Sequence, residues 1–296
     1  GACCGHFLPF RRVAVVLRTR EMQGDDQDGD SVVVYGPHYR GCEYRRLLLA
    51  RSIEADLPAD GQAATRSLAA FLALLGLETA FASAECAGTR WRTWYHSAAT
   101  SAASPLQLAR MEAQRQAAAA WCSGSTLSFQ GEERSLPWLI NFAVDCDDAE
   151  LLQALLHFFL SFYGCAAELR SPLLPPVQWP EEESGVVRLW HYSALRKDWR
   201  LREGSVFRLG GFADGSHRRS AAEAEVEWCF EIPGGKQVPL LYLDPELTGD
   251  GVPRFVLQPY TLVVVRQLEL GSEGPRTVWL GFPGELGQTW EAPIGP

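Results

Sequence analysis

The stretch that decides the fold lies in the C-terminal third, at residues 201–216, and reads LREGSVFRLGGFADGS. A β-branched and aromatic run at 205–209 meets a glycine pair, which is typical of a strand that ends in a turn. Comparable runs surround it, with Gly and Pro between most of them: residues 186–192, 226–232, 238–243, 255–257, 261–270 and 277–282. An Ala- and Glu-rich run at 220–227 predicts a short helix. The C-terminal third therefore reads as a β-rich domain.

The chain is expected to begin with a β hairpin. Residues 13–17 and 31–35 are β-branched runs, and the turn-forming residues 23–30 lie between them. Alternating aspartates in this turn resemble the start of a calcium loop, but the required glutamate and flanking helices do not follow. An acidic hairpin loop is the better interpretation.

The middle of the chain is predicted to be helical, from about residue 60 to residue 164. Ser104, followed by Pro105, predicts one helix start, and Asp147, followed three residues later by Glu150, predicts another. The second helix is expected to end at Gly164. His157 falls on its apolar face, where a core or boundary histidine is the better interpretation than a metal ligand.

These patterns predict an α+β protein, in which a helical middle packs on a C-terminal antiparallel or mixed β core. The expected segments are a β-hairpin segment at 1–58, a helical segment at 59–170, a Pro-rich connector at 171–185 and the β domain at 186–296. Pro cannot donate to a helix or a central strand, so the connector marks the seam.

Composition excludes several classes of function. The chain of 296 residues has a net charge of −9, which repels a phosphate backbone and argues against nucleic-acid binding. No apolar run is long enough for a membrane span. The eight cysteines are scattered, which favours reduced thiols and an intracellular protein. Protein partners are the expected ligands, with the oligomeric state left open.

Catalytic and metal motifs are mostly missing. The sequence has no Walker loop, no GxGxxG opening a helix, no GxSxG and no HExxH. The cluster Cys3-Cys4-Gly5-His6 lacks the paired CxxC of a structural zinc site, so no metal is expected. The triplet Glu181-Glu182-Glu183 stands beside the Pro-rich turn, where carboxylates are usually solvated.

The order of features in the C-terminal third is more specific. An Arg lies in the strand 186–192, a glycine-led strand ends at Phe212-Ala213-Asp214-Gly215-Ser216, and the segment 255–265 reads FVLQPYTLVVV. This order resembles the catalytic core of the arginine-type mono-ADP-ribosyltransferases over about one hundred residues. The resemblance implies that the C-terminal domain has the fold of that family and that NAD is a possible cofactor.

Carried over by position, the resemblance implies that Arg188, Phe212 and Ser216 contact NAD. It departs from the family at Pro253-Arg254-Phe255, where a Glu-x-Glu pair should stand. Neither Pro nor Phe offers a side-chain acceptor for the ribose or the nucleophile. No residue is therefore predicted to be catalytic.

Three functions stay open at this point. The favoured one is a catalytically inactive ADP-ribosyltransferase-like binding or scaffold protein. An active, divergent NAD-dependent transferase or NAD glycohydrolase would need Asp244, Glu246 or Asp250 to replace the missing acid. A structural subunit of a large protein assembly is the third, and a chance resemblance among Gly- and Pro-punctuated strands is the alternative to all of them.

Overall fold

The computed structural model describes residues 34–35, 42–49, 60–77, 105–168, 186–193, 201–219, 226–233, 240–243, 254–269 and 276–282. All of them lie within one compact unit, Val32–Pro296. The expected strand at 13–17, the acidic turn, the cluster Cys3-Cys4-Gly5-His6 and the connector at 171–185 lie outside these stretches. The division of the chain at residues 58, 170 and 185 stays a prediction.

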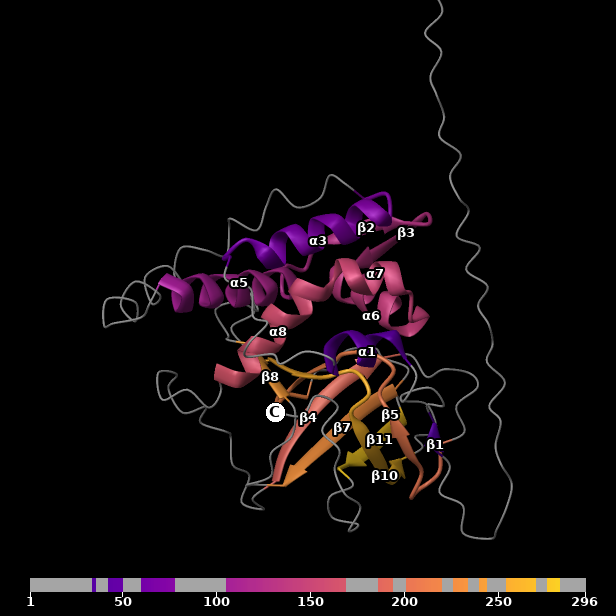
Figure 1. The fold of residues 1–296 in the computed structure, drawn as a ribbon. Coiled ribbons are helices and arrows are strands. Elements are labelled where there is room, and N and C mark those ends of the chain that lie inside the picture. The colour runs from indigo at the N-terminus through magenta and orange to yellow at the C-terminus, as the bar shows by residue number, and fades with distance from the viewer. Residues whose placement is uncertain are drawn as a thin grey trace, which may run out of the picture. The chain divides into compact units, whose positions relative to one another are not determined.

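Nine strands of the described residues form one mixed sheet, in the order β1-β5-β10-β11-β7-β4-β6-β9-β8 (Figure 1). Their bounds are β1 Val34–Tyr35, β4 Val186–Ser193, β5 Val206–Arg208, β6 Ala213–Ser216, β7 Val226–Pro233, β8 Leu240–Leu243, β9 Arg254–Leu257, β10 Leu262–Glu269 and β11 Arg276–Gly281. Only the pairs β1–β5 and β7–β11 are parallel within this sheet. The predicted C-terminal strands and the α+β class are confirmed.

The helical part contains six described helices and one hairpin. The helices are α1 Glu43–Leu49, α3 Ala63–Leu74, α5 Pro105–Trp121, α6 Leu136–Cys146, α7 Ala149–Ala154 and α8 Leu156–Glu168, and the hairpin is β2 Thr126–Phe129 with β3 Glu132–Ser135. Pro105 is the first residue of α5, as its missing N–H allows. No described helix has both the length and the apolarity that crossing a bilayer would require.

The predicted helix start at Asp147 is wrong by one residue. Asp147 takes a left-handed conformation, with φ 50° and ψ 39°, and ends α6. The next residue, Asp148, is extended, and its Oδ1 accepts from the N–H groups of Glu150 and Leu151, each at 3.0 Å. The capping carboxylate has to come from an extended residue, so Asp148 begins α7.

The predicted single helix from there to Gly164 is also wrong. The helix breaks at Leu155, which caps α7, and α8 continues beyond Gly164 to Glu168. His157 is exposed rather than part of the core.

The predicted helix at 220–227 is wrong at its C-terminal end, because β7 begins at Val226. β7 pairs with β4 over its whole length, from Val226 opposite Ser193 to Pro233 opposite Val186. This pairing overrides the helical preference of the local sequence. Residues 220–225 lie outside the described stretches.

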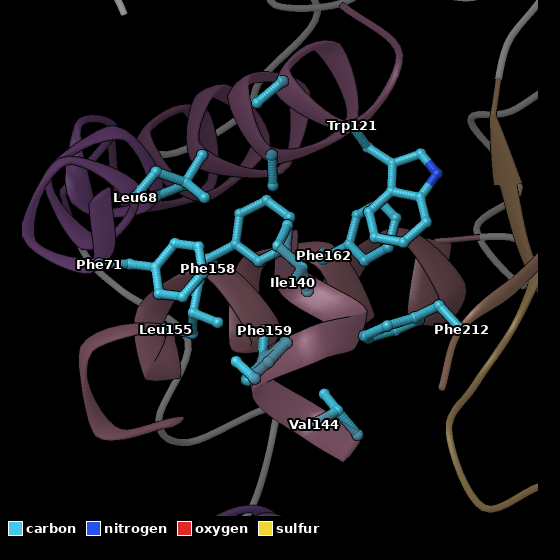
Figure 2. Packing of buried hydrophobic residues seen from close by; sticks show 14 of the residues in the cluster. Leu68, Phe71, Trp121, Ile140, Val144, Leu155, Phe158, Phe159, Phe162 and Phe212 are labelled. Atoms are coloured by element: carbon cyan, nitrogen blue, oxygen red, sulfur yellow. The ribbon is translucent and has the colours of Figure 1, made fainter. Parts of the chain in front are cut away.

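Two hydrophobic clusters hold the described unit together. One lies on a single face of the sheet and contains Leu189, Phe230, Phe255 and Leu280 among others. The other joins the helices to the edge of the sheet, where Leu241, Leu243 and Val256 contribute. Figure 2 shows the aromatic centre of this second cluster, with Phe212 at its side near Trp121 of α5 and Phe162 of α8. The helical layer therefore packs directly onto the strands that carry the candidate site.

Candidate functional site

The three segments on which the family resemblance rests are neighbouring strands. β4 carries Arg188, β6 carries Ser216 and β9 begins with Arg254, and the sheet places them in the order β4-β6-β9. Trp190 of β4 lies opposite Ser216, and Ser216 lies opposite Arg254. Directly opposed residues point to the same side of a sheet, so these three side chains share one face. We call it the Arg188 face.

Arg188 lies two residues before Trp190 and therefore points to the same side. Its partner across the ladder is Glu231 of β7, and Arg188 Nε donates to Glu231 Oε1 at 3.2 Å. The guanidinium also lies 5.3 Å from the ring centroid of Trp279 in β11. Its side chain keeps 34% of its surface exposed. Arg188 is thus held in place by a carboxylate and a ring, yet still reachable from solvent.

Aromatic and charged side chains alternate across this part of the sheet. The rings of Trp190 and Trp279 meet edge to face, with centroids 5.6 Å apart. Arg219 lies 4.8 Å from the centroid of Trp190 and forms an ion pair with the buried Glu227, with Nη2 2.5 Å from Oε2. This hydrogen bond raises the pKa of Arg219. Cations over indole faces stabilise such an arrangement.

Ser216 ends β6 beside a second group of charges. Its Oγ accepts from the backbone N–H of Arg218 at 3.1 Å, so the hydroxyl hydrogen is still available to donate. Two residues earlier, Asp214 pairs with Arg254, Nη1 to Oδ2 at 3.2 Å. His191 Nδ1 lies 2.6 Å from the backbone carbonyl oxygen of Asp214. The Arg188 face therefore presents three arginines, Arg188, Arg219 and Arg254, each already paired with a carboxylate.

Phe212 occupies a different environment from the other two predicted NAD contacts. Its side chain is 4% exposed and stacks on Phe159 and Tyr163, with Trp121 and Phe162 edge-on (Figure 2). The ring therefore anchors β6 to the helices. Its contact with NAD stays a prediction, as do those of Arg188 and Ser216.

Asn141 of α6 holds the backbone at Phe212. Its Nδ2 donates to the Phe212 carbonyl at 2.9 Å, and its Oδ1 accepts from the Phe212 N–H at 2.8 Å. A Cβ added to Gly211 would stand 2.7 Å from the same Oδ1. The glycine is therefore needed for the close approach of helix and strand.

Phe255 stands where the resemblance expects the second glutamate of the motif. It is 2% exposed and belongs to the apolar cluster of the sheet, on the side opposite the Arg188 face. Arg254, between the two expected glutamates, pairs with Asp214 instead. Pro253 and the acids considered as replacements, Asp244, Glu246 and Asp250, lie outside the described residues.

Sequence reasoning missed the residues that complete this face. Glu231 and Trp279 lie on strands that were predicted, but only the register of the sheet brings them to Arg188. Asn141 had one signal, since it is the sole asparagine of the chain. In the described part of the chain, no group of three His, Cys, Asp or Glu side chains could hold a metal ion.

Comparison with known proteins gives structural matches alone. No family model and no curated protein matches the sequence. Solved structures similar to the chain include an ADP-ribosyltransferase. This is the C3larvin toxin of Paenibacillus larvae, which is 12% identical, with a TM-score of 0.28, covering 42% of this chain and 73% of the toxin.

Two other similar structures are also of bacterial proteins. Exoenzyme S of Pseudomonas aeruginosa, solved with human 14-3-3 protein beta and carba-NAD, is 13% identical, with a TM-score of 0.42, over 75% of this chain and 94% of the exoenzyme chain. A truncated type III effector XopAI of Xanthomonas axonopodis pv. citri is 13% identical, with a TM-score of 0.39, over 80% of this chain and 95% of the effector.

The Arg188 face offers guanidinium groups and indole rings to a ligand. Guanidinium groups donate strong hydrogen bonds to phosphate or carboxylate oxygens, and indole rings offer flat apolar area. Three carboxylates of the face, Asp214, Glu227 and Glu231, are each paired with an arginine. The strand that should carry the catalytic acid presents Arg254 to this face instead.

Proposed function

We propose that the chain is a catalytically inactive, ADP-ribosyltransferase-like binding protein. The observation that carries the proposal is Phe255, which is 2% exposed and packed in the sheet core at the position where the resemblance expects a glutamate. Transfer from NAD develops positive charge at the nicotinamide ribose, and a positioned carboxylate stabilises it. A phenyl ring in an apolar core has no acceptor to offer.

Retention of a binding function is supported by the Arg188 face. Arg188 is 34% exposed and lies beside Trp279, so an anionic ligand with a flat ring would find both a cation and an aromatic surface there. NAD has this chemistry. Glu231 competes for the same guanidinium, so we expect NAD to bind weakly.

Isothermal calorimetry with NAD tests the binding half of the proposal. Saturable binding to the wild type should be lost in Arg188→Ala, because the variant removes the guanidinium that lies over Trp279. Arg66→Ala is the matched control, since Arg66 is a 65% exposed arginine of α3 that pairs with Asp60, away from the sheet. Undiminished binding in Arg188→Ala would show that any NAD site lies elsewhere.

An assay of nicotinamide release from NAD tests the inactive half. We expect no release above a heat-denatured control. Release that disappears in Asp244→Asn, Glu246→Gln or Asp250→Asn would contradict the proposal and identify the acid. The chain would then be an active, divergent NAD glycohydrolase or transferase.

A further inference from the structure

A second group of aromatic side chains, half-buried except for one exposed ring, lies at the surface of the helical layer. It consists of Phe129 in β2, Arg134 in β3, and Trp138 and Phe142 in α6, and we call it the hairpin–α6 surface. Trp138 is 37% exposed, which makes it one of three large apolar side chains exposed among the described residues. Exposed tryptophan is costly to keep in water, and it is enriched among residues that dominate protein interfaces.

Trp138 has one aromatic and one cationic neighbour, which fix the orientation of its ring. Phe142 stacks on one face of the indole, with centroids 5.6 Å apart and planes inclined by 11°. The guanidinium of Arg134 lies 4.4 Å from the ring centroid. Phe129 completes the cluster, with its ring 5.5 Å from that of Phe142. An anchor that is already ordered loses little conformational entropy when a partner binds.

Local structure fixes the elements that carry these rings. Gln130 and Gly131 both have positive φ, at 54° and 84°, which suits the two-residue turn of a tight hairpin. Ser135 then caps α6, accepting from the Trp138 N–H at 3.4 Å, and Pro137 follows in the first turn. The hairpin therefore leads into the helix without a flexible linker, and the surface has a defined shape.

Acidic side chains flank the rings at both ends. Glu132 opposes Phe129 in the hairpin and is 65% exposed, with Arg134 as its partner. Asp145 is exposed and lies seven residues after Trp138, two turns along the same side of α6. The whole chain carries a net charge of −9. An apolar partner with basic flanks complements this arrangement, whereas a nucleic acid would be repelled.

We propose that the hairpin–α6 surface binds a short protein segment whose apolar side chain contacts Trp138 and whose Lys or Arg residues flank that side chain on both sides. The apolar contact supplies affinity, and the flanking charges set the orientation and the association rate. This surface shares no residue with the Arg188 face, so the two binding functions are separable.

A displayed library of random 12-residue peptides tests the proposal on the full chain. Selection against the wild type, with counter-selection against Trp138→Ala, should enrich peptides with an apolar residue between basic ones. A fluorescein-labelled consensus peptide should then bind the wild type in an anisotropy titration and bind Trp138→Ala at least about tenfold more weakly. Tenfold corresponds to about 1.4 kcal/mol of binding free energy, and truncation of a central anchor residue costs more than that.

Three matched variants guard against trivial outcomes. Leu106→Ala truncates another exposed apolar side chain and should leave peptide binding unchanged. Arg188→Ala should also leave peptide binding unchanged. Failure of the NAD-binding proposal can therefore be told apart from failure of the peptide-binding proposal. Glu132→Gln keeps the fold and the rings but should weaken binding and flatten its salt dependence.

Two outcomes would overturn the inference. One is a selection that enriches acidic or purely apolar peptides. A selection in which no enriched peptide binds the wild type more tightly than Trp138→Ala counts as the same outcome. The other is self-association. If the molecular mass in solution doubled with rising concentration for the wild type but not for Trp138→Ala, and no peptide bound, the surface would be a contact between two copies of the chain.

Discussion

At the scale of single residues, one amide connects the helical layer to the candidate site. Asn141 makes two hydrogen bonds to the backbone of Phe212, which is otherwise fixed by its ring contacts. Phe212 directly precedes β6, the strand that ends in Ser216. Any change at Asn141 is therefore felt both in stability and in the placement of β6.

We predict that Asn141→Ala lowers the free energy of unfolding by about 1–3 kcal/mol, because the backbone N–H and C=O of Phe212 lose their partner. Urea unfolding followed by circular dichroism measures the loss. Asn141→Asp keeps the acceptor and removes the donor, so it should restore part of the stability near neutral pH. A change in Asn141→Ala too small to resolve would mean that water replaces the amide.

His217 gives a pH dependence at the same scale. Burial, and to a smaller extent Arg218, lowers the pKa of His217, and its Nδ1 is buried without a hydrogen-bond partner. The unfolded chain then binds a proton more readily than the folded one, so stability should decrease as the pH falls below about 6.5. His217→Gln should flatten this decrease when unfolding midpoints are compared between pH 7 and pH 5. An unchanged slope would assign the acid sensitivity to other groups.

At the scale of elements, the sequence predicts the C-terminal strands well because each is a short apolar run ended by Gly or Pro. The hairpin β2–β3 was not predicted, because its two short runs are polar and lie within a stretch that reads as helical. The only signal for it was the pair Gln130-Gly131, which is typical of a turn. Arg188 was predicted from an ordered set of segments. Its partners Glu231 and Trp279 were not, because strand register depends on the whole sheet.

The start of α7 provides a prediction about an element. Asp148→Ala should cost about 1 kcal/mol of stability, since two backbone N–H groups of the first turn lose their acceptor. Asp148→Ser retains an acceptor oxygen and should lose much less. Chemical denaturation of both variants beside the wild type decides it. Equal losses would indicate that the charge of Asp148, rather than its hydrogen bonds, stabilises the helix.

At the scale of the whole described unit, the helices and the sheet share one aromatic cluster, so neither is expected to unfold alone. Tyr163 of α8 and Tyr260 in the turn after β9 lie where the two parts meet. Burial is the main cause that raises the pKa of both phenols. Tyr260 raises the pKa of Tyr163 further, and Cys42, Asp147 and Asp145 raise that of Tyr260 further. Ionising either phenol therefore requires this cluster to open.

Alkaline unfolding should report on that junction. The folded state retains the phenol protons that the unfolded chain releases near pH 10. The contribution of the two phenols to stability is therefore fully present below about pH 10 and is lost as the pH rises further. In absorbance at 295 nm, part of the tyrosine titration should coincide with loss of far-ultraviolet circular dichroism. Tyr163→Phe removes a buried hydroxyl without a partner, so it should keep its stability at pH 7 and lose less of it above pH 10. Tyrosine ionisation that is complete before any loss of circular dichroism would contradict this. The cluster would then open while the helices and the sheet stay folded, so it would not couple their unfolding.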